Sequence, residues 1–165
     1  MKLFLTSYLA GTKNLVNDFL SELQPREIVF VPTAANVEEY RGYVDEAIAA
    51  FQEMGFELRT LDVSKAEPEE ALSMIKACRC LYVSGGNTFY LLQELKKKGL
   101  VTVIKSRVKD GMLYVGESAG AIIASHSVEY SQIMDDRSVA AELEDCSGLG
   151  LVDYCVLPHN GEFPF

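Results

Sequence analysis

One serine of this sequence stands in a pattern typical of an activated nucleophile. Residues 116–120 read Gly-Glu-Ser-Ala-Gly, with the apolar run Leu113–Gly116 leading into them and the small apolar run Ala121–Ala124 after them. A G-x-S-x-G segment between a strand and a helix forms a sharp turn that exposes the serine hydroxyl at the carboxyl edge of a sheet. Ser118 is therefore the candidate nucleophile, and the Ala119 N–H, at the start of the helix, is a candidate donor to an oxyanion. A serine here can also be a simple helix cap, so other residues must decide.

A serine hydroxyl needs a base within hydrogen-bond reach, and the sequence holds two histidines. If one helix continues from Ser118 to His126, the two residues are separated by about 12 Å along its axis, which favours a structural role for His126. His159 follows Pro158 and the apolar run Leu151–Leu157, which we expect to be a strand. In open α/β sheets ligands bind beyond the carboxyl ends of strands, so His159 is the candidate base.

The third member of a catalytic triad is a carboxylate that orients the imidazole. Asp135 and Asp136 lie between Ser118 and His159 in the chain, and either could serve. The same interval holds five further acids, namely Glu129, Glu142, Glu144, Asp145 and Asp153.

A glycine pair forms a second candidate part of the site. Ser84, Gly85, Gly86 and Asn87 come between an expected strand and an expected helix. Without Cβ atoms the glycines let backbone N–H groups approach a bound substrate closely, although a Gly-Gly pair can also be only a turn.

Short β-rich runs alternate with amphipathic runs along the whole chain, which predicts an α/β fold. The helical runs are expected over residues 13–23, 37–54, 67–77 and 87–99, with Leu15 and Tyr40 on apolar stripes. Residues 128–146 are polar and are expected to form a loop with a short strand. The prediction is a three-layer αβα sandwich with a mostly parallel sheet, formed by the strands Leu3–Ser7, Ile28–Pro32, Phe56–Asp62, Cys80–Val83, Leu113–Gly116 and Leu151–Leu157.

The bulk properties exclude several classes of partner. The chain of 165 residues carries 15 basic and 24 acidic residues, and this net charge of −9 repels nucleic acid and anionic lipid. No stretch approaches the roughly 18 apolar residues of a membrane helix. The four cysteines lack metal or redox spacing, which predicts reduced thiols and a cytoplasmic location. We expect one soluble domain over residues 1–165, a monomer or homodimer, with no metal and no cofactor.

Three motifs together resemble the peptidase E family of serine peptidases, family S51, whose relatives include cyanophycinase and which shares its fold with class I glutamine amidotransferases. They are Tyr82-Val-Ser-Gly-Gly-Asn-Thr88, Val115-Gly-Glu-Ser-Ala-Gly-Ala121 and Leu157-Pro-His-Asn160, and their order and spacing are specific. The resemblance covers essentially the whole chain. It implies a class I glutamine amidotransferase-like, flavodoxin-like fold.

The same resemblance implies roles for individual residues. Ser118 would be the nucleophile, His159 the base, and Asp135, ahead of Asp136, the acid. Gly86 N–H would join Ala119 N–H in the oxyanion hole.

The resemblance further implies a substrate class and one departure from the family. Peptidase E cleaves short peptides after an amino-terminal aspartate, so Asp-X dipeptides are the implied substrates. Family members usually continue for several tens of residues beyond the histidine, which implies that a C-terminal segment is missing here.

Two other functions stay open at this stage. One is an esterase of the α/β-hydrolase class, which also uses G-x-S-x-G but has an HGGG-type motif that this chain lacks. The other is a non-catalytic binding protein derived from the family by truncation.

Overall fold

A computed structural model describes residues 1–161, and the last four residues of the expected domain lie outside that range. Its centre is one sheet of five parallel strands in the order β1-β5-β4-β2-β3. The nucleophile strand β5 pairs with β1 on one side and with β4 on the other. The strands are β1 (Leu3–Thr6), β2 (Glu27–Val31), β3 (Glu57–Thr60), β4 (Cys80–Val83) and β5 (Leu113–Glu117).

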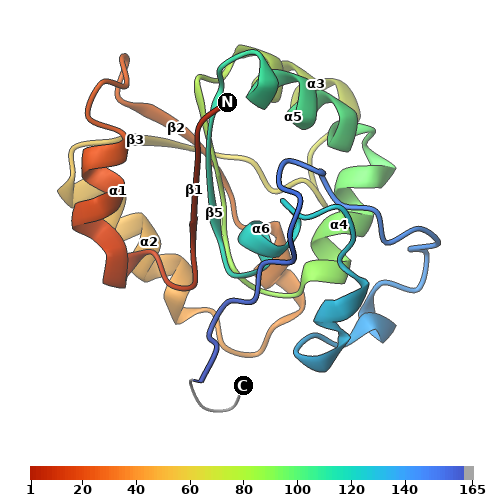
Figure 1. Cartoon of the computed structure of the whole chain (residues 1–165). Coiled ribbons are helices and arrows are strands. Elements are labelled where there is room, and N and C mark those ends of the chain that lie inside the picture. The colour runs from red at the N-terminus through yellow and green to blue at the C-terminus, as the bar shows by residue number, and fades with distance from the viewer. Residues whose placement is uncertain (162–165) are drawn as a thin grey trace.

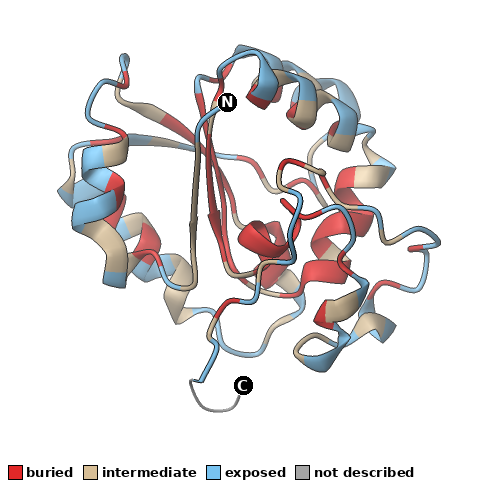
Figure 2. Ribbon diagram, viewed as in Figure 1, coloured by how far each residue is buried: buried red, intermediate tan, exposed pale blue. Residues whose placement is uncertain are grey.

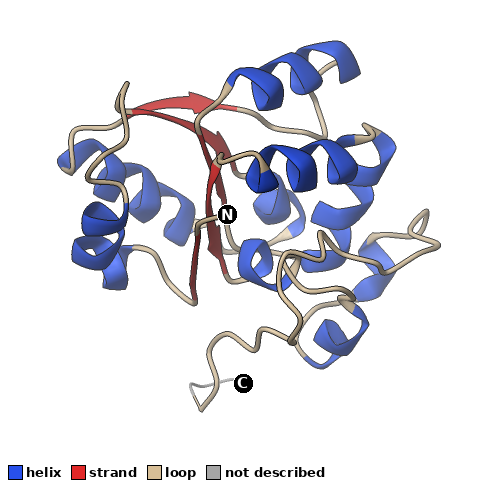
Figure 3. Ribbon diagram, turned by 45° about the horizontal axis from the view of Figure 1, so that its top comes forward, coloured by secondary structure: helices blue, strands red, loops and turns tan. Residues whose placement is uncertain are grey.

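Helices cover both faces of this sheet (Figures 1 and 3). One face carries two helices, α1 (Lys13–Phe19) and α2 (Gly42–Glu53). The other carries α3 (Pro68–Ala77), α4 (Thr88–Lys97), α5 (Leu100–Lys109) and α6 (Ala119–Ile122). Short 3₁₀ segments complete the connections, namely η1 (Ala10–Thr12), η2 (Thr33–Val37), η3 (Glu129–Ile133) and η4 (Arg137–Val139).

In strand β2, successive apolar side chains pack alternately into the cores on the two faces of the sheet. Ile28 and Phe30 belong to the core under α1 and α2, whereas Val29 and Val31 belong to the core under α3–α6. Side chains of successive strand residues point to opposite faces, so a strand covered on both sides is apolar at every position. Figure 2 shows the central strands β2, β4 and β5 mostly in red, between helices whose outward surfaces are pale. The predicted three-layer α/β sandwich is confirmed.

The predicted strand Leu151–Leu157 is wrong, because this segment has irregular backbone. Its apolar residues do not alternate between two faces: Leu151 is buried, but Tyr154 and Leu157 are 63% and 55% exposed. The segment is fixed by local hydrogen bonds instead, from Leu151 N and Val152 N to the carbonyl of Ala124. The sheet therefore has five strands among the described residues, and not six.

The predicted helices and loop differ from the structure in four respects. The helix expected over 13–23 ends at Phe19. The helix expected over 37–54 begins only at Gly42, and Tyr40 ahead of it is 68% exposed. Leu15 on α1 is also 62% exposed, so the predicted stripes were too wide. Residues 128–146 form η3 and η4, with one isolated bridge between Ser127 and Ser147 in place of a strand.

Helix α5 was not assigned from the sequence. Its buried residues Leu100, Ile104 and Val108 follow one another at intervals of four, which is the helical signal that could have found it. None of the helices among residues 1–161 has the length and apolar character needed to cross a bilayer.

Close packing of backbone at Gly120 gives the first prediction. A Cβ atom at Gly120 would lie 2.1 Å from the carbonyl oxygen of Val83 in β4, so Gly120→Ala must push α6 away from the sheet. We expect a loss of at least about 2 kcal/mol in the free energy of unfolding, measured by urea denaturation.

Gly99 provides the control for that measurement. It has φ +66°, but no atom lies within 4 Å of an added Cβ, so Gly99→Ala should cost only the backbone strain of about 1 kcal/mol. Equal losses in the two variants would contradict the steric explanation.

Candidate active site

Ser118 lies between the last residue of β5 and the first residue of α6, in a backbone conformation that L-residues rarely adopt. Its dihedral angles are φ 47° and ψ −106°. The Ser118 N–H donates to the carbonyl of Thr6 in the neighbouring strand at 2.9 Å, and the Ser118 carbonyl accepts from Ala121 N and Ile122 N. These bonds hold a turn whose strain costs of order 1–3 kcal/mol.

Two glycines make this turn possible. A Cβ at Gly116 would lie 2.5 Å from the carbonyl oxygen of Gly120, and a Cβ at Gly120 would strike β4 as described above. Strand, turn and helix can thus approach one another only with glycine at both positions. The G-x-S-x-G pattern is explained by contacts on both sides of the nucleophile.

His159 contacts Ser118 directly, with 3.0 Å between His159 Nε2 and Ser118 Oγ. This distance suits a hydrogen bond between a nucleophile and its base. The His159 backbone N–H donates to Ser7 Oγ at 3.1 Å, so the histidine is anchored just past the end of β1. The histidine therefore reaches the carboxyl edge as the sequence suggested, but on irregular backbone.

Tyr130 fixes the segment that carries His159. Its hydroxyl donates to the carbonyl of Val156 at 2.8 Å and accepts from Val156 N at 3.0 Å. Ser125 Oγ lies 3.1 Å from the same hydroxyl, which joins the segment to the residues that follow α6. Nothing in the sequence pattern singles out Tyr130, because its partner is backbone 26 residues away.

His126 is in a different place. Helix α6 ends at Ile122, so the expectation of one helix from Ser118 to His126 is wrong. The His126 side chain is 65% exposed and its Nε2 lies 3.0 Å from Asp153 Oδ1. It does not line the cavity at Ser118.

The structure separates the two candidate acids. Asp135 is half-buried beside the site, and its Oδ2 accepts from the Thr88 N–H at the start of α4 at 3.1 Å. Burial raises the pKa of Asp135, while the bonds from Thr88 and the charge of His159 oppose the rise. Asp136 is exposed and accepts from Ser138 N and Ser138 Oγ, both at 2.8 Å, which lower its pKa.

The five further acids lie elsewhere. Glu142 pairs with Lys97, Asp145 with Lys96 and Asp153 with His126. All five are exposed and none lines the cavity at Ser118: Glu129, Glu142, Glu144, Asp145 and Asp153.

The glycine loop lies against the nucleophile. A Cβ at Gly85 would be 3.3 Å from Ser118 Cβ, and Gly86 has φ +127° with room for no side chain beside the Ala34 backbone. Ser84 N and Asn87 N donate to the carbonyls of Val31 and Ala34, which fixes the loop to β2 and η2. Glycine at position 86 is thus required by the backbone conformation and by the nearby Ala34 backbone, and glycine at position 85 lets the loop lie close to Ser118.

Asn87 connects this loop to the acid. Its Oδ1 accepts from Tyr90 N at 3.0 Å and caps α4, while its Nδ2 donates to the carbonyl of Asp136 at 3.0 Å. The Ala119 N–H is at the first position of α6, where no intrahelical acceptor exists. The glycine loop, the turn at Ser118 (the elbow) and the segment that holds Asp135 and Asp136 therefore meet at one point.

These residues line one cavity of about 740 Å³ at the carboxyl edge of the sheet. Ser118, His159 and Asp135 are in its wall, together with the glycine loop and the side chains of Glu38 and Tyr43. Within residues 1–161 no cluster of three or more His, Cys, Asp or Glu side chains is arranged to hold a metal ion.

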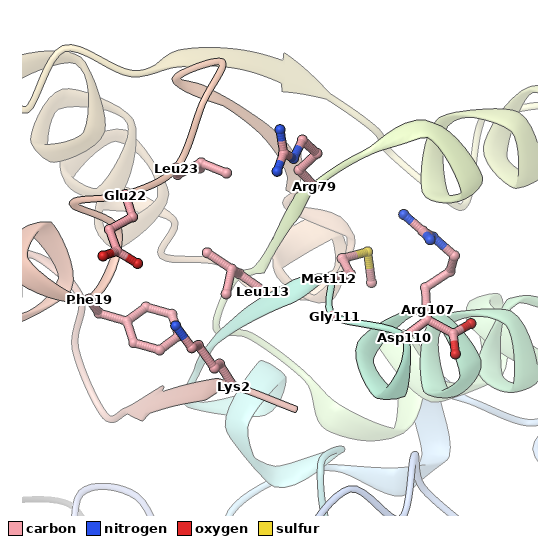
Figure 4. Close-up of a pocket in the computed structure, with 10 residues that line it drawn as sticks. All are labelled: Lys2, Phe19, Glu22, Leu23, Arg79, Arg107, Asp110, Gly111, Met112 and Leu113. Carbon is pink, nitrogen blue, oxygen red and sulfur yellow. The ribbon is translucent and has the colours of Figure 1, made fainter.

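A smaller cavity of about 320 Å³ lies at the opposite, amino edge (Figure 4). Arg79 and Arg107 in its lining donate to the backbone carbonyls of Gln24 and Cys78. Glu22 and Asp110 share the lining, and no nucleophile or histidine is present there. The side chains that could take part in catalysis therefore lie at the carboxyl edge.

The comparisons with known proteins agree with this geometry. Residues 3–164 match the family described as peptidase family S51. The chain belongs to that family. It is 43% identical to an uncharacterised peptidase of Pasteurella multocida (strain Pm70) over 99% of this chain and 79% of that protein. A peptidase E of Nostoc sp. (strain PCC 7120) is 30% identical over 92% of this chain and 59% of its own length.

A solved structure also resembles this chain closely. A 1.5 Å crystal structure from Listeria monocytogenes EGD-e, described as a candidate peptidase E protein, superposes with a TM-score of 0.96 at 40% identity. The match covers 100% of this chain and 82% of that one. This S51 member is thus a serine-type peptidase with the flavodoxin-like fold of class I glutamine amidotransferases.

Sequence reasoning missed Glu117, the variable residue of the G-x-S-x-G pattern. Its side chain is 1% exposed, its Oε1 accepts from Leu9 N at 2.7 Å, and its Oε2 accepts from the Tyr82 hydroxyl. Burial raises the pKa of Glu117, against the bonds from Tyr82 and Leu9. Both Tyr82 and Glu117 stand in the family-like motifs, but the contact between their side chains, from β4 to β5, is not visible in the sequence.

The raised pKa of Glu117 predicts a dependence of stability on pH. A carboxyl whose folded pKa exceeds its unfolded value near 4.5 stabilises the fold at lower pH, and this contribution is lost as pH rises through the folded pKa. The Gln variant does not titrate at this position. The free energy of unfolding of the wild type, minus that of Glu117→Gln, should therefore decrease as pH rises from 4.5 towards neutrality. Urea denaturation across that range measures it, and a constant difference would show that the Glu117 pKa is not raised.

Proposed function

We propose that this peptidase hydrolyses short peptides through an acyl-enzyme on Ser118. The observation that carries the proposal is the 3.0 Å contact between His159 Nε2 and Ser118 Oγ on a strained turn. His159 takes the proton of Ser118 as Oγ attacks the peptide carbonyl. The leaving amine receives that proton, and water then attacks the acyl-enzyme with His159 again acting as base.

Negative charge develops on the carbonyl oxygen in both steps. The N–H groups of Ala119 and Gly86 are the proposed donors to it, since the elbow and the glycine loop lie side by side. Asp135 is the proposed acid of the triad. The charge of His159 lowers the pKa of Asp135, which places the two groups near each other, and the bond from Thr88 N holds the carboxyl in place, so Asp135 can orient the imidazole and stabilise the imidazolium.

Asp-X dipeptides, which the family resemblance implies, are the first substrates to assay. The match to a peptidase E-like structure and the strand order favour a peptidase over the esterase alternative. A binding protein without catalysis would keep the fold but hydrolyse nothing, so turnover decides between the two.

Replacing the nucleophile gives the most direct kinetic prediction. Ser118→Ala should abolish hydrolysis of Asp-X dipeptides, or of a chromogenic aspartyl amide, because it removes the hydroxyl that lies 3.0 Å from His159 Nε2. Ser106→Ala on exposed α5 is the matched control and should retain full kcat/KM. Unchanged turnover in Ser118→Ala would remove Ser118 from the mechanism.

The two neighbouring aspartates form a second matched pair. Asp135→Asn should lower kcat by about 10²- to 10⁴-fold, because the imidazolium loses its charged partner. Asp136→Asn disturbs only the two hydrogen bonds from the exposed Ser138 and should change kcat less than about threefold. Steady-state kinetics of both variants checks this, and a reversed order would make Asp136 the acid.

A further inference from the structure

The cavity at Ser118 has a wall that the proposed chemistry does not use. Glu38 follows η2, and Tyr43 lies in the first turn of α2, so both come from the connection between β2 and α2. Both side chains line the same cavity as Ser118 and His159. Neither residue belongs to the motifs singled out from the sequence.

Glu38 is a half-buried carboxylate with no compensating partner. Among the described residues its carboxylate makes no hydrogen bond or ion pair, and its charged neighbour in the cavity is Asp135, which has the same sign. Burial and the charge of Asp135 both raise the pKa of Glu38. Removing a carboxylate from water without a partner is costly, so such a group in a cavity is suited to a cationic ligand.

Tyr43 provides an independent observation on the same wall. Its hydroxyl oxygen is buried, and among residues 1–161 it has no hydrogen-bond partner. Its ring edge packs 3.5 Å from the Cβ position of Gly85, the glycine that faces Ser118. Burial and the carboxylates of Glu38 and Glu117 raise the pKa of Tyr43 to about 12, against the opposing charge of Arg41, so the phenol keeps its proton at neutral pH. Buried hydroxyls without partners are uncommon, and this one belongs to a residue that lines the cavity.

The charge of the cavity points to the same class of ligand. The lining formed by residues 1–161 holds four carboxyl groups, those of Glu38, Glu117, Asp135 and Asp136, and neither Lys nor Arg. An ammonium group offers three N–H donors, which a carboxylate and a phenol oxygen can accept together.

We propose that Glu38 and Tyr43 form a subsite that binds an ammonium group of the peptide substrate beside Ser118. The inference rests on the proposed function for the identity of the substrate, but it concerns binding and not the chemical step. The ammonium can be the free amino terminus or a lysine side chain at the first position. In either case it holds the first residue of the peptide in the cavity that contains the nucleophile.

Binding to an inactive protein tests this without turnover. In the Ser118→Ala background, isothermal titration calorimetry would compare Ala-Ala, N-acetyl-Ala-Ala and N-acetyl-Lys-Ala. We expect Ala-Ala to bind at least tenfold more tightly than N-acetyl-Ala-Ala. If N-acetyl-Lys-Ala also binds tenfold more tightly than N-acetyl-Ala-Ala, the subsite accepts a side-chain ammonium as well.

Second-site variants connect the preference to the two residues. Adding Glu38→Gln should reduce the preference for ammonium-bearing peptides to less than threefold, and Tyr43→Phe should weaken their binding while circular dichroism stays unchanged. Glu39→Gln, at the neighbouring exposed position, should leave the preference intact. Equal binding of all three peptides, no binding of any, or an undiminished preference in Glu38→Gln would overturn the proposal.

Failure of the proposed function would look different. A wild-type protein that hydrolyses no peptide, but whose Ser118→Ala form still prefers the ammonium peptides, would retain the subsite and lose the catalytic assignment.

Discussion

The backbone at Ser118 is the constraint on which the rest of this structure depends. Its φ of 47° places the hydroxyl above the carboxyl edge of the sheet, facing away from the core. A turn of this kind exists only if the strand before it and the helix after it can nearly touch, which Gly116 and Gly120 allow. The strain is sustained because β5 is paired on both sides and α6 is fully buried. Rigid surroundings thus hold a conformation that an isolated peptide would leave.

The other groups of the site lie on loops and irregular segments, and hydrogen bonds to neighbouring parts of the fold hold each of them near Ser118. The glycine loop is hydrogen-bonded to the carbonyls of Val31, at the end of β2, and Ala34, in η2, and Asp135 is held by the first amide of α4. His159 has no strand before it and depends on Tyr130 and Ser7 for its position. Sheet and helices set the frame, while loops bring the reactive groups together.

The sequence predicted what is encoded locally. Five strands, the elbow and the glycine loop follow from short-range patterns of apolar and small residues, so they could be found without a structure. The prediction of a strand before His159 was wrong because an apolar run indicates only that some of its side chains are buried, and not that a partner strand is available. Asp135 and Asp136 are chemically the same in sequence. Only the tertiary contact with Thr88 distinguishes them, and no pattern within the chain reports that contact. Glu117 and Tyr43 were missed for the same reason, since their importance comes from burial among distant residues.

The central claim is that His159 activates Ser118, and a fluorophosphonate probe measures that activation directly. The probe forms a stable adduct only with a serine whose proton a neighbouring base removes. Peptide mass spectrometry of the labelled wild-type protein should locate a single adduct on Ser118, and His159→Ala should prevent it. Folded protein that takes up no label, or that is labelled at another residue while Ser118 stays unmodified, would contradict the account.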